Sequence, residues 1–241
     1  MSHLPLASRQ GVLVESADSL HYMLKGIIFD MDGTLGDTLQ LCIESYRAAT
    51  AELTGRKPSA EEVVSYFGLS DRGVLGGLLG MNPDSPELPI GTFVRIYCEL
   101  HDELAPAPFP GAAELLRNLK ARGLKLALLT GKEHHTGEPT LAKFGMEGVF
   151  DLHLYGDPFY NCKADNLKRA MAAWQLGPQE IIYVGDAPSD ISLCHSVGVP
   201  IINAAWGSNS AADSAACTAL NPEFRLADFA ELEPLLTKLT S

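Results

Sequence analysis

Residues 23–34 read Met-Leu-Lys-Gly-Ile-Ile-Phe-Asp-Met-Asp-Gly-Thr, and this stretch decides how the rest of the chain is interpreted. Its apolar run predicts a buried β-strand over residues 23–30. Because residues two apart in an extended backbone face the same side, we expect the carboxylates of Asp30 and Asp32 to converge where the strand ends. Two carboxylates that close together are electrostatically costly unless a cation or a shared proton relieves them. The alternative interpretation is an acidic turn that only ends the strand.

A second acidic pair follows another apolar run. Residues 181–184 read Ile-Ile-Tyr-Val and lead into Asp186 and Asp190, whose spacing of four lets both side chains face the same way on a helix. Helix capping by acidic side chains is the alternative interpretation. Both pairs follow the C-terminal ends of strands, which form the ligand-binding edge of open α/β sheets. Three or four convergent carboxylates favour Mg2+ and disfavour zinc, since no cysteine or histidine cluster accompanies them.

Strands and helices alternate through the second half of the chain. We expect strands over 124–130, 149–155, 181–185 and 199–203, and helices over 111–122, 138–145, 164–176 and 188–197. This alternation is typical of βαβ units. The sequence therefore predicts an α/β protein with a Rossmann-like, doubly wound and mostly parallel sheet that helices cover on both faces.

Residues 38–104 interrupt that alternation, because their patterns are helical throughout. We expect helices over 38–54, 59–67, 71–79 and 86–104, the last broken by Pro89 and Gly91. Three prolines within residues 106–110 then predict a stiff boundary segment. The domains predicted from these patterns are an N-terminal extension at 1–22, a core formed by 23–37 and 109–241, and a small α-helical cap domain at 38–108.

Two further segments offer groups for an anion. Thr130, Gly131 and Lys132 end a predicted strand, where a hydroxyl and backbone N–H groups can hold phosphate oxygens. The segment is not a P-loop, because Leu126 stands where that motif needs a glycine. Lys163 opens the next helical stretch and could offset the negative site, although a solvated surface lysine is the alternative interpretation.

The order of these motifs resembles that of the haloacid dehalogenase-like (HAD) hydrolases, especially phosphatases with a helical cap after the first strand. The resemblance runs from about residue 24 to the C-terminus and rests on residues 30–35, 128–132 and 184–190. Residues 109–111 (Phe-Pro-Gly) also resemble the cap exit of phosphoglycolate- and pyrophosphate-cleaving members. The resemblance implies a phosphatase that acts on a small phosphorylated metabolite, either phosphoglycolate-like or a sugar phosphate.

The resemblance also implies roles for the acidic residues. Asp30 would be the nucleophile that forms an aspartyl-phosphate, and Asp32 the general acid and then the general base. Mg2+ would be held by the Asp30 carboxylate, the Asp32 backbone carbonyl and Asp186, with Asp190 supporting the bound waters. These roles agree with the chemistry, because a carboxylate that attacks an anionic phosphoryl group needs its repulsion cancelled.

The phosphoryl group itself would be held by Thr130, Gly131 and Lys163 in this resemblance. The family's lysine is usually followed by a proline-containing stretch, whereas Lys163 is followed by Ala-Asp-Asn. Lys132 and Lys168 therefore stay as alternative phosphate ligands.

Arg72 is a candidate specificity residue in the predicted cap. It lies in a glycine-flanked turn between two helical segments, and a guanidinium can bind a substrate carboxylate or second phosphate in two places. A surface arginine paired with Asp71 or another nearby acid is the alternative interpretation.

Other functions compete with the phosphatase interpretation. Mutases of the β-phosphoglucomutase type resemble this architecture but carry a histidine twelve residues after the nucleophile, where this chain has Cys42. A phospho-receiver module shares the acceptor aspartate, Mg2+, hydroxyl and lysine, but receivers are about half this length and lack a helical insertion. A catalytically silent HAD-like binding protein is a further alternative.

Composition limits the partners. The formal net charge is −12, from 18 basic and 30 acidic residues, and it disfavours nucleic acid and anionic membranes. Apolar runs all stay well short of the roughly 18 residues of a membrane span. Five widely spaced cysteines without a CxxC pair fit a reducing compartment. We therefore expect a cytoplasmic enzyme, monomeric or homodimeric, without nucleic-acid or membrane partners.

Overall fold

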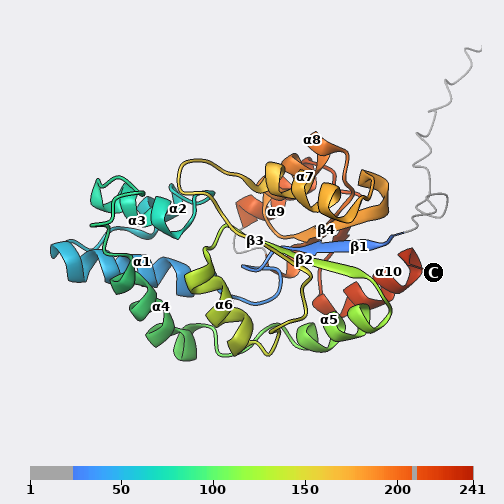
Figure 1. Ribbon diagram of the computed structural model, residues 1–241, viewed down its shortest axis with the longest axis horizontal. Helices are drawn as coiled ribbons and strands as arrows, with labels where there is room; N and C mark the ends of the chain where they lie inside the picture. The colour runs from blue at the N-terminus through green and yellow to red at the C-terminus, as the bar shows by residue number, and fades with distance from the viewer. Residues whose placement is uncertain (1–23, 208–210, 241) are drawn as a thin grey trace, which may run out of the picture.

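A computed structural model describes residues 24–207 and 211–240, and the extension expected at residues 1–22 lies outside this part of the chain. The chain forms an α/β core and, beside it, a group of helices that we call the cap (α1–α4, residues 39–104) (Figure 1). The α/β fold with an inserted helical cap was predicted from the sequence and is confirmed. The exact domain boundaries remain predictions.

The core is built on a six-stranded sheet in the order β3-β2-β1-β4-β5-β6, and every neighbouring pair is parallel. The strands are β1 (Gly26–Phe29), β2 (Lys125–Leu129), β3 (Leu152–Leu154), β4 (Ile181–Gly185), β5 (Ile201–Ala204) and β6 (Phe224–Leu226). Phe29 of β1 is in register with Leu128 of β2 and with Val184 of β4. The segments that follow these three strands therefore emerge side by side at one edge of the sheet.

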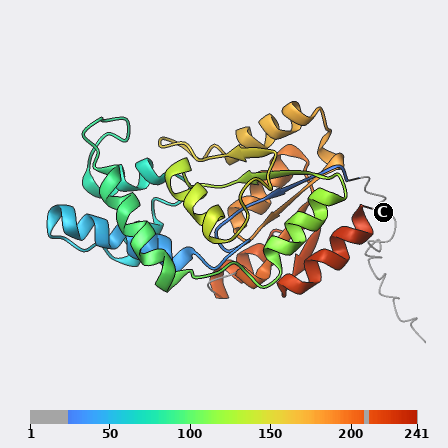
Figure 2. The same ribbon diagram turned by 60° about the horizontal axis from the view of Figure 1, so that its bottom comes forward.

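Helices cover both faces of the sheet (Figures 1 and 2). They are α5 (Ala112–Ala121), α6 (His134–Lys143), α7 (Lys163–Trp174), α8 (Pro188–Val197), α9 (Ala211–Ala219) and α10 (Leu232–Leu239). Ile27 and Phe29 pack in one hydrophobic cluster with α5, α6 and α10, while Ile28 packs in a second cluster with α7, α8 and α9. This division follows from the alternation of side chains along a strand.

The cap has a hydrophobic core of its own. Its helices are α1 (Leu39–Thr54), α2 (Ala60–Val64), α3 (Asp71–Leu79) and α4 (Ile90–Leu104). The rings of Tyr46 and Phe93 stack with centroids 4.2 Å apart, which joins α1 to α4. A Cβ at Gly77 would lie 2.3 Å from the Tyr66 ring, so this glycine allows α3 to pack closely against the segment that follows α2.

The two chain crossings between core and cap run side by side. The Phe109 N–H donates to the Leu35 carbonyl at 3.0 Å, which joins the segment that leaves the cap to the segment that leads into it. The proline-rich segment before Phe109 stiffens this exit. None of the helices in the described residues is long and apolar enough to cross a membrane.

Some expected elements differ from those observed. β1 spans only Gly26–Phe29 rather than 23–30, and the helix expected over 138–145 begins at His134 and contains Pro139. The helix expected over 86–104 begins at Ile90, because Pro89 precedes its first turn. β6, α9 and α10 were not predicted from the sequence. β6 is only three residues long, and α9 is mostly alanine with a single buried side chain, so neither has a strong periodic pattern.

Candidate active site

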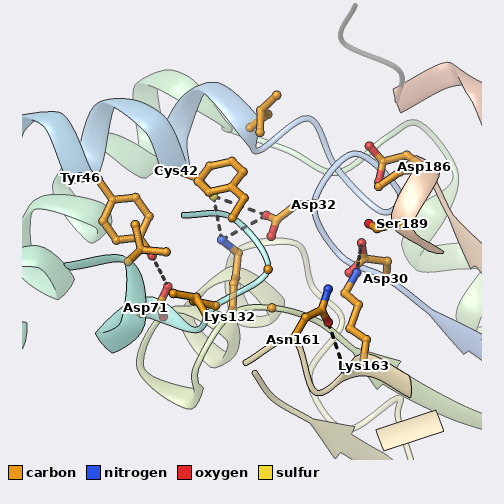
Figure 3. A pocket seen from close by; sticks show the side chains of 17 residues that line it. Asp30, Asp32, Cys42, Tyr46, Asp71, Lys132, Asn161, Lys163, Asp186 and Ser189 are labelled. Carbon is orange, nitrogen blue, oxygen red and sulfur yellow. Dashed lines mark hydrogen bonds and ion pairs between the residues drawn. The ribbon is translucent and has the colours of Figure 1, made fainter. Parts of the chain in front are cut away.

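A cavity of about 270 Å³ lies between the core and the cap, at the edge of the sheet where β1, β2 and β4 end (Figure 3). Core and cap residues line it together, namely Asp30, Asp32, Leu39, Cys42, Tyr46, Phe67, Gly68, Leu69, Asp71, Val74, Gly131, Lys132, Asn161, Lys163, Asp186, Ala187 and Ser189. Asp30, Lys163, Asp186 and Ser189 gather on one side of it, while Lys132 lies with Cys42 and Asp32 on the other. The cavity therefore has a core side and a cap side with different chemistry.

On the core side, Lys163 joins two aspartates. Its ammonium group lies 2.9 Å from Asp30 Oδ2 and 2.9 Å from Asp190 Oδ1, and it also donates to the Tyr183 hydroxyl at 3.4 Å. Burial opposes the charge of Lys163, but Asp190 and Asp30 outweigh it and raise the pKa of this lysine well above its usual value. Lys163 is therefore a permanent positive charge beside the Asp30 carboxylate.

Glycines allow the acidic segments to approach each other. Gly33 has φ +72°, and a Cβ there would lie 2.3 Å from Asp186 Oδ2. A Cβ at Gly207 would lie 1.7 Å from the Gly33 carbonyl oxygen. These positions need glycine because the turn after β1 packs directly against the Asp186 carboxylate and against the segment after β5.

Three carboxylates form a group that fits a hard divalent cation. One oxygen each from Asp30, Asp186 and Asp190 lie within 4.8 Å of one another. Burial, and then the charges of Asp30 and Asp190, raise the pKa of Asp186 to about 9. Burial also raises the pKa of Asp30 to about 7, although Lys163 lowers it. A bound cation would relieve the repulsion between these carboxylates. Carboxylate oxygens are also the ligands that Mg2+ prefers.

The Asp32 carboxylate points away from this group. Its Oδ1 accepts a hydrogen bond from Thr38 Oγ1 and lies 3.1 Å from the Lys132 ammonium. The alternation that predicts convergence with Asp30 requires an extended strand, but β1 ends at Phe29 and the chain bends at Met31. The two aspartates line the same cavity and face different sides of it.

The structure places the other predicted phosphate ligands differently from one another. Gly131 lines the cavity, while Thr130 is fully buried and its hydroxyl accepts from the Lys132 backbone N–H at 3.2 Å. Lys168 lies apart from the cavity lining, with its side chain 61% exposed and 3.7 Å from Asp165. Of the three candidate lysines, Lys163 pairs with members of the group formed by Asp30, Asp186 and Asp190, whereas Lys132 pairs with Asp32.

Arg72, the predicted specificity residue, is bound within the cap. Its Nε donates to the Pro83 carbonyl at 2.8 Å and its Nη2 to the Ser85 carbonyl at 3.1 Å. Arg72 is not among the described residues that line the cavity. Its contacts hold the segment after α3, and a role toward a substrate stays a prediction.

Two helix N-termini meet where the cap touches the core, and each supplies a side chain to the other. Asp71, at the start of α3, accepts from the Glu133 N–H at 2.9 Å and from Thr136 Oγ1, both at the start of α6. Glu133 in turn accepts from Ser70 Oγ at 2.5 Å and from the Arg72 N–H at 3.1 Å. We call this arrangement, formed by Ser70, Asp71, Arg72, Glu133 and Thr136, the α3–α6 junction. It fastens the cap to the core beside the cavity.

Sequence reasoning missed several residues of the cavity. Asp71, Tyr46, Asn161 and Ser189 line it without having been predicted as site residues. The Tyr46 hydroxyl donates to Asp71 at 2.8 Å, and Asn161 Oδ1 accepts from the Lys163 N–H at 3.2 Å. The serine and aspartate at a predicted helix start were a capping signal for Asp71, but its partner helix lies 62 residues away in the sequence.

Comparison with known proteins identifies the class to which this fold and site belong. A sequence profile of the haloacid dehalogenase-like hydrolases matches residues 27–204, so the chain belongs to this family. The resemblance inferred from the motifs is thereby confirmed.

Individual relatives carry related names. A phosphoglycolate phosphatase from Thiobacillus denitrificans is 32% identical over 196 residues, which cover 77% of this chain and 85% of the relative. A candidate pyrophosphatase PpaX from Caldanaerobacter subterraneus subsp. tengcongensis is 29% identical over 185 residues, covering 76% and 82%. The crystal structure of CbbY from Rhodobacter sphaeroides in complex with phosphate shares the fold, with a TM-score of 0.69 at 21% identity and coverage of 87% and 96%.

Proposed function

We propose that the protein is a Mg2+-dependent phosphatase that hydrolyses a small phosphorylated metabolite through an aspartyl-phosphate on Asp30. The observation that carries the proposal is the environment of the Asp30 carboxylate. It lies 2.9 Å from the buried Lys163 ammonium and within 4.8 Å of oxygens from Asp186 and Asp190, at a cavity of about 270 Å³. The names of the relatives support phosphate-ester or phosphoanhydride substrates.

The metal would be held by the carboxylates of Asp30 and Asp186 and by the backbone carbonyl of Asp32, with Asp190 supporting bound waters. When bound, Mg2+ supplies positive charge that offsets the repulsion between the nucleophile and an anionic phosphoryl group. The close approach of Gly33 to Asp186 supports this assignment, because it brings the turn after β1 against the carboxylate.

The reaction has two steps. In the first, an Asp30 oxygen forms a bond to phosphorus while the bond to the leaving oxygen breaks, and Asp32 gives that oxygen a proton. In the second, water forms a new bond to phosphorus, Asp32 takes a proton from the water, and the bond to Asp30 breaks to release inorganic phosphate. Lys163 and the backbone N–H of Gly131 would hold the phosphoryl oxygens, with Thr130 shaping that loop.

A phosphate-release screen tests this function. The panel should contain phosphoglycolate, pyrophosphate, several sugar phosphates and p-nitrophenyl phosphate, each with Mg2+ and with excess EDTA. We expect release with Mg2+ and loss of release with EDTA that added Mg2+ restores. Full activity in excess EDTA would refute the metal-dependent mechanism.

The net charge and the free cysteines bear on where the enzyme acts and on its partners. We propose that it acts on free metabolites in the cytoplasm, as a monomer or homodimer, because its negative charge of −12 disfavours polyanionic partners. Its five free cysteines, four of them buried, suit a reducing compartment.

A further inference from the structure

Lys132 is a second buried lysine of the cavity, and its side chain is only 4% exposed. Its ammonium group lies 3.1 Å from Asp32 Oδ1 and 3.0 Å from Cys42 Sγ (Figure 3). It also lies 4.7 Å from the centre of the Tyr97 ring. Asp32 belongs to the core, whereas Cys42 is on α1 and Tyr97 on α4 of the cap. Lys132 therefore brings core and cap together at Asp32.

The contact between Lys132 and Asp32 is an ion pair. Burial opposes the ammonium charge, but the Asp32 carboxylate 3.1 Å away stabilises it and raises the pKa of Lys132 well above its usual value. Burial raises the pKa of the Cys42 thiol to about 12, so the thiol is neutral. The Lys132 side chain is buried, whereas that of Asp32 is 26% exposed toward the cavity. Separating the pair would leave the buried ammonium without its counter-charge, which is unfavourable, so the contact restrains both side chains.

Within the described residues, the side-chain hydrogen bonds of Asp32 and its closest approach to Lys132 all involve one oxygen, Oδ1. Thr38 Oγ1 donates to it, the Lys132 ammonium pairs with it, and the Cys42 thiol approaches it at 3.7 Å. With Oδ1 held by these groups, the carboxylate cannot rotate freely. Oδ2 is the oxygen that remains to exchange a proton with a substrate.

We propose that Lys132 is a positioning residue for Asp32, which holds Oδ1 so that Oδ2 meets the leaving-group oxygen and then the attacking water. This inference rests on the proposed function, in which Asp32 is the general acid and base. The proton passes from Oδ2 to the leaving oxygen as its bond to phosphorus breaks, and Oδ2 regains a proton from water in the second step. Lys132 itself gives and takes no proton.

The leaving group provides the readout. An alkoxide needs a proton when it leaves, whereas p-nitrophenolate is stable as an anion. Rapid-quench measurement of the first turnover should therefore be made with propyl phosphate and with p-nitrophenyl phosphate, both with Mg2+. We expect Lys132→Met to slow release of propanol by roughly 10²-fold or more, the scale of general acid catalysis, while release of p-nitrophenolate changes little. KM should stay near the wild-type value for both substrates.

Two further variants distinguish a role in positioning Asp32 from a role in merely attaching the cap to the core. Lys143→Met removes another core lysine that pairs with a cap residue, Asp102 on α4, but at a distance from Asp32. It should show no preference between the two leaving groups. Lys132→Arg keeps the buried charge with a different shape, so it should fold and show the same preference as Lys132→Met, at smaller magnitude.

The outcomes are distinct. Selective loss of propanol release in both Lys132 variants, absent in Lys143→Met, would support the positioning role. Equal losses on both substrates, or a folded Lys132→Arg with no preference, would overturn it. Absence of Mg2+-dependent release by the wild-type protein from both substrates and from the metabolite panel would instead refute the proposed function.

Discussion

Two buried lysines distinguish the core side of the cavity from its cap side. Lys163 pairs with Asp30 and Asp190, which both belong to the core. Lys132 pairs with Asp32 and contacts Cys42, so its surroundings come from the core and the cap together. The core side can therefore form without the cap, whereas the cap side is complete only when the cap is in place. In the proposed mechanism this difference separates two roles, because the core residues would hold the phosphoryl group while proton transfer by Asp32 would depend on the cap.

The largest effect should come from Asp30, the proposed nucleophile on the core side. Asp30→Asn removes the attacking carboxylate, and we expect turnover to fall by roughly 10⁴-fold or more, on the scale of nucleophile deletions in other hydrolases. No phosphorylated protein should be trapped by acid quench and mass spectrometry. Asp37→Asn is the matched control, because Asp37 is exposed and lies in the same turn region. Substantial turnover by Asp30→Asn would show that another group attacks phosphorus.

The core side could be predicted from the sequence because its signals are local. Asp30, Thr130 and Asp186 each follow an apolar run, and parallel strands bring such positions to one edge of the sheet. Lys163 was harder to assign, since its usual sequence context is missing. In the structure α7 begins at Lys163, and its ammonium group lies 2.9 Å from Asp30 Oδ2.

The next effect concerns metal affinity. Asp186→Asn removes one carboxylate from the buried group, and the Mg2+ concentration for half-maximal activity should rise by at least the roughly 10–100-fold that outer-shell substitutions cost. Because the pKa of Asp186 is raised to about 9 by burial and neighbouring anions, the metal-free variant should melt no lower than the metal-free wild type. Mg2+ should raise the melting temperature of the wild type more than that of the variant. An unchanged Mg2+ dependence would remove Asp186 from the metal site.

The contacts on the cap side of the cavity could not be predicted from sequence patterns. Lys132 and Cys42 are 90 residues apart, and Asp71 and Thr136 are 65 apart. No local period relates such positions, because their contacts depend on how the cap packs against the core. The helices of the cap were predicted from their own periodicity, but the residues that they bring to the cavity were not.

A smaller effect should come from a substitution in the α3–α6 junction. Glu133→Ala removes the acceptor for Ser70 Oγ and the Arg72 N–H, and we expect the free energy of unfolding to fall by about 1 kcal/mol, as for other helix caps. Because these bonds join the cap to the core, KM should also rise. Urea denaturation and steady-state kinetics measure the two effects.

Ser59→Ala is the matched control for that prediction. Ser59 caps α2 by accepting from the Glu62 N–H at 3.1 Å, entirely within the cap. It should lose similar stability with no change in KM. If the two variants had the same KM, the α3–α6 junction would contribute to stability alone.

The smallest effect should be that of Arg72→Ala, which separates a structural role from a specificity role on the cap side. The guanidinium donates to the Pro83 and Ser85 carbonyls, so its loss should lower the free energy of unfolding by about 1–2 kcal/mol. Since Arg72 is not among the described cavity-lining residues, KM should change equally little for phosphoglycolate and for p-nitrophenyl phosphate. A rise of roughly tenfold for phosphoglycolate alone would mean that Arg72 releases its carbonyl partners to bind the substrate carboxylate, an interaction on the scale of one charged hydrogen bond. The cap side would then recognise the substrate in addition to orienting Asp32.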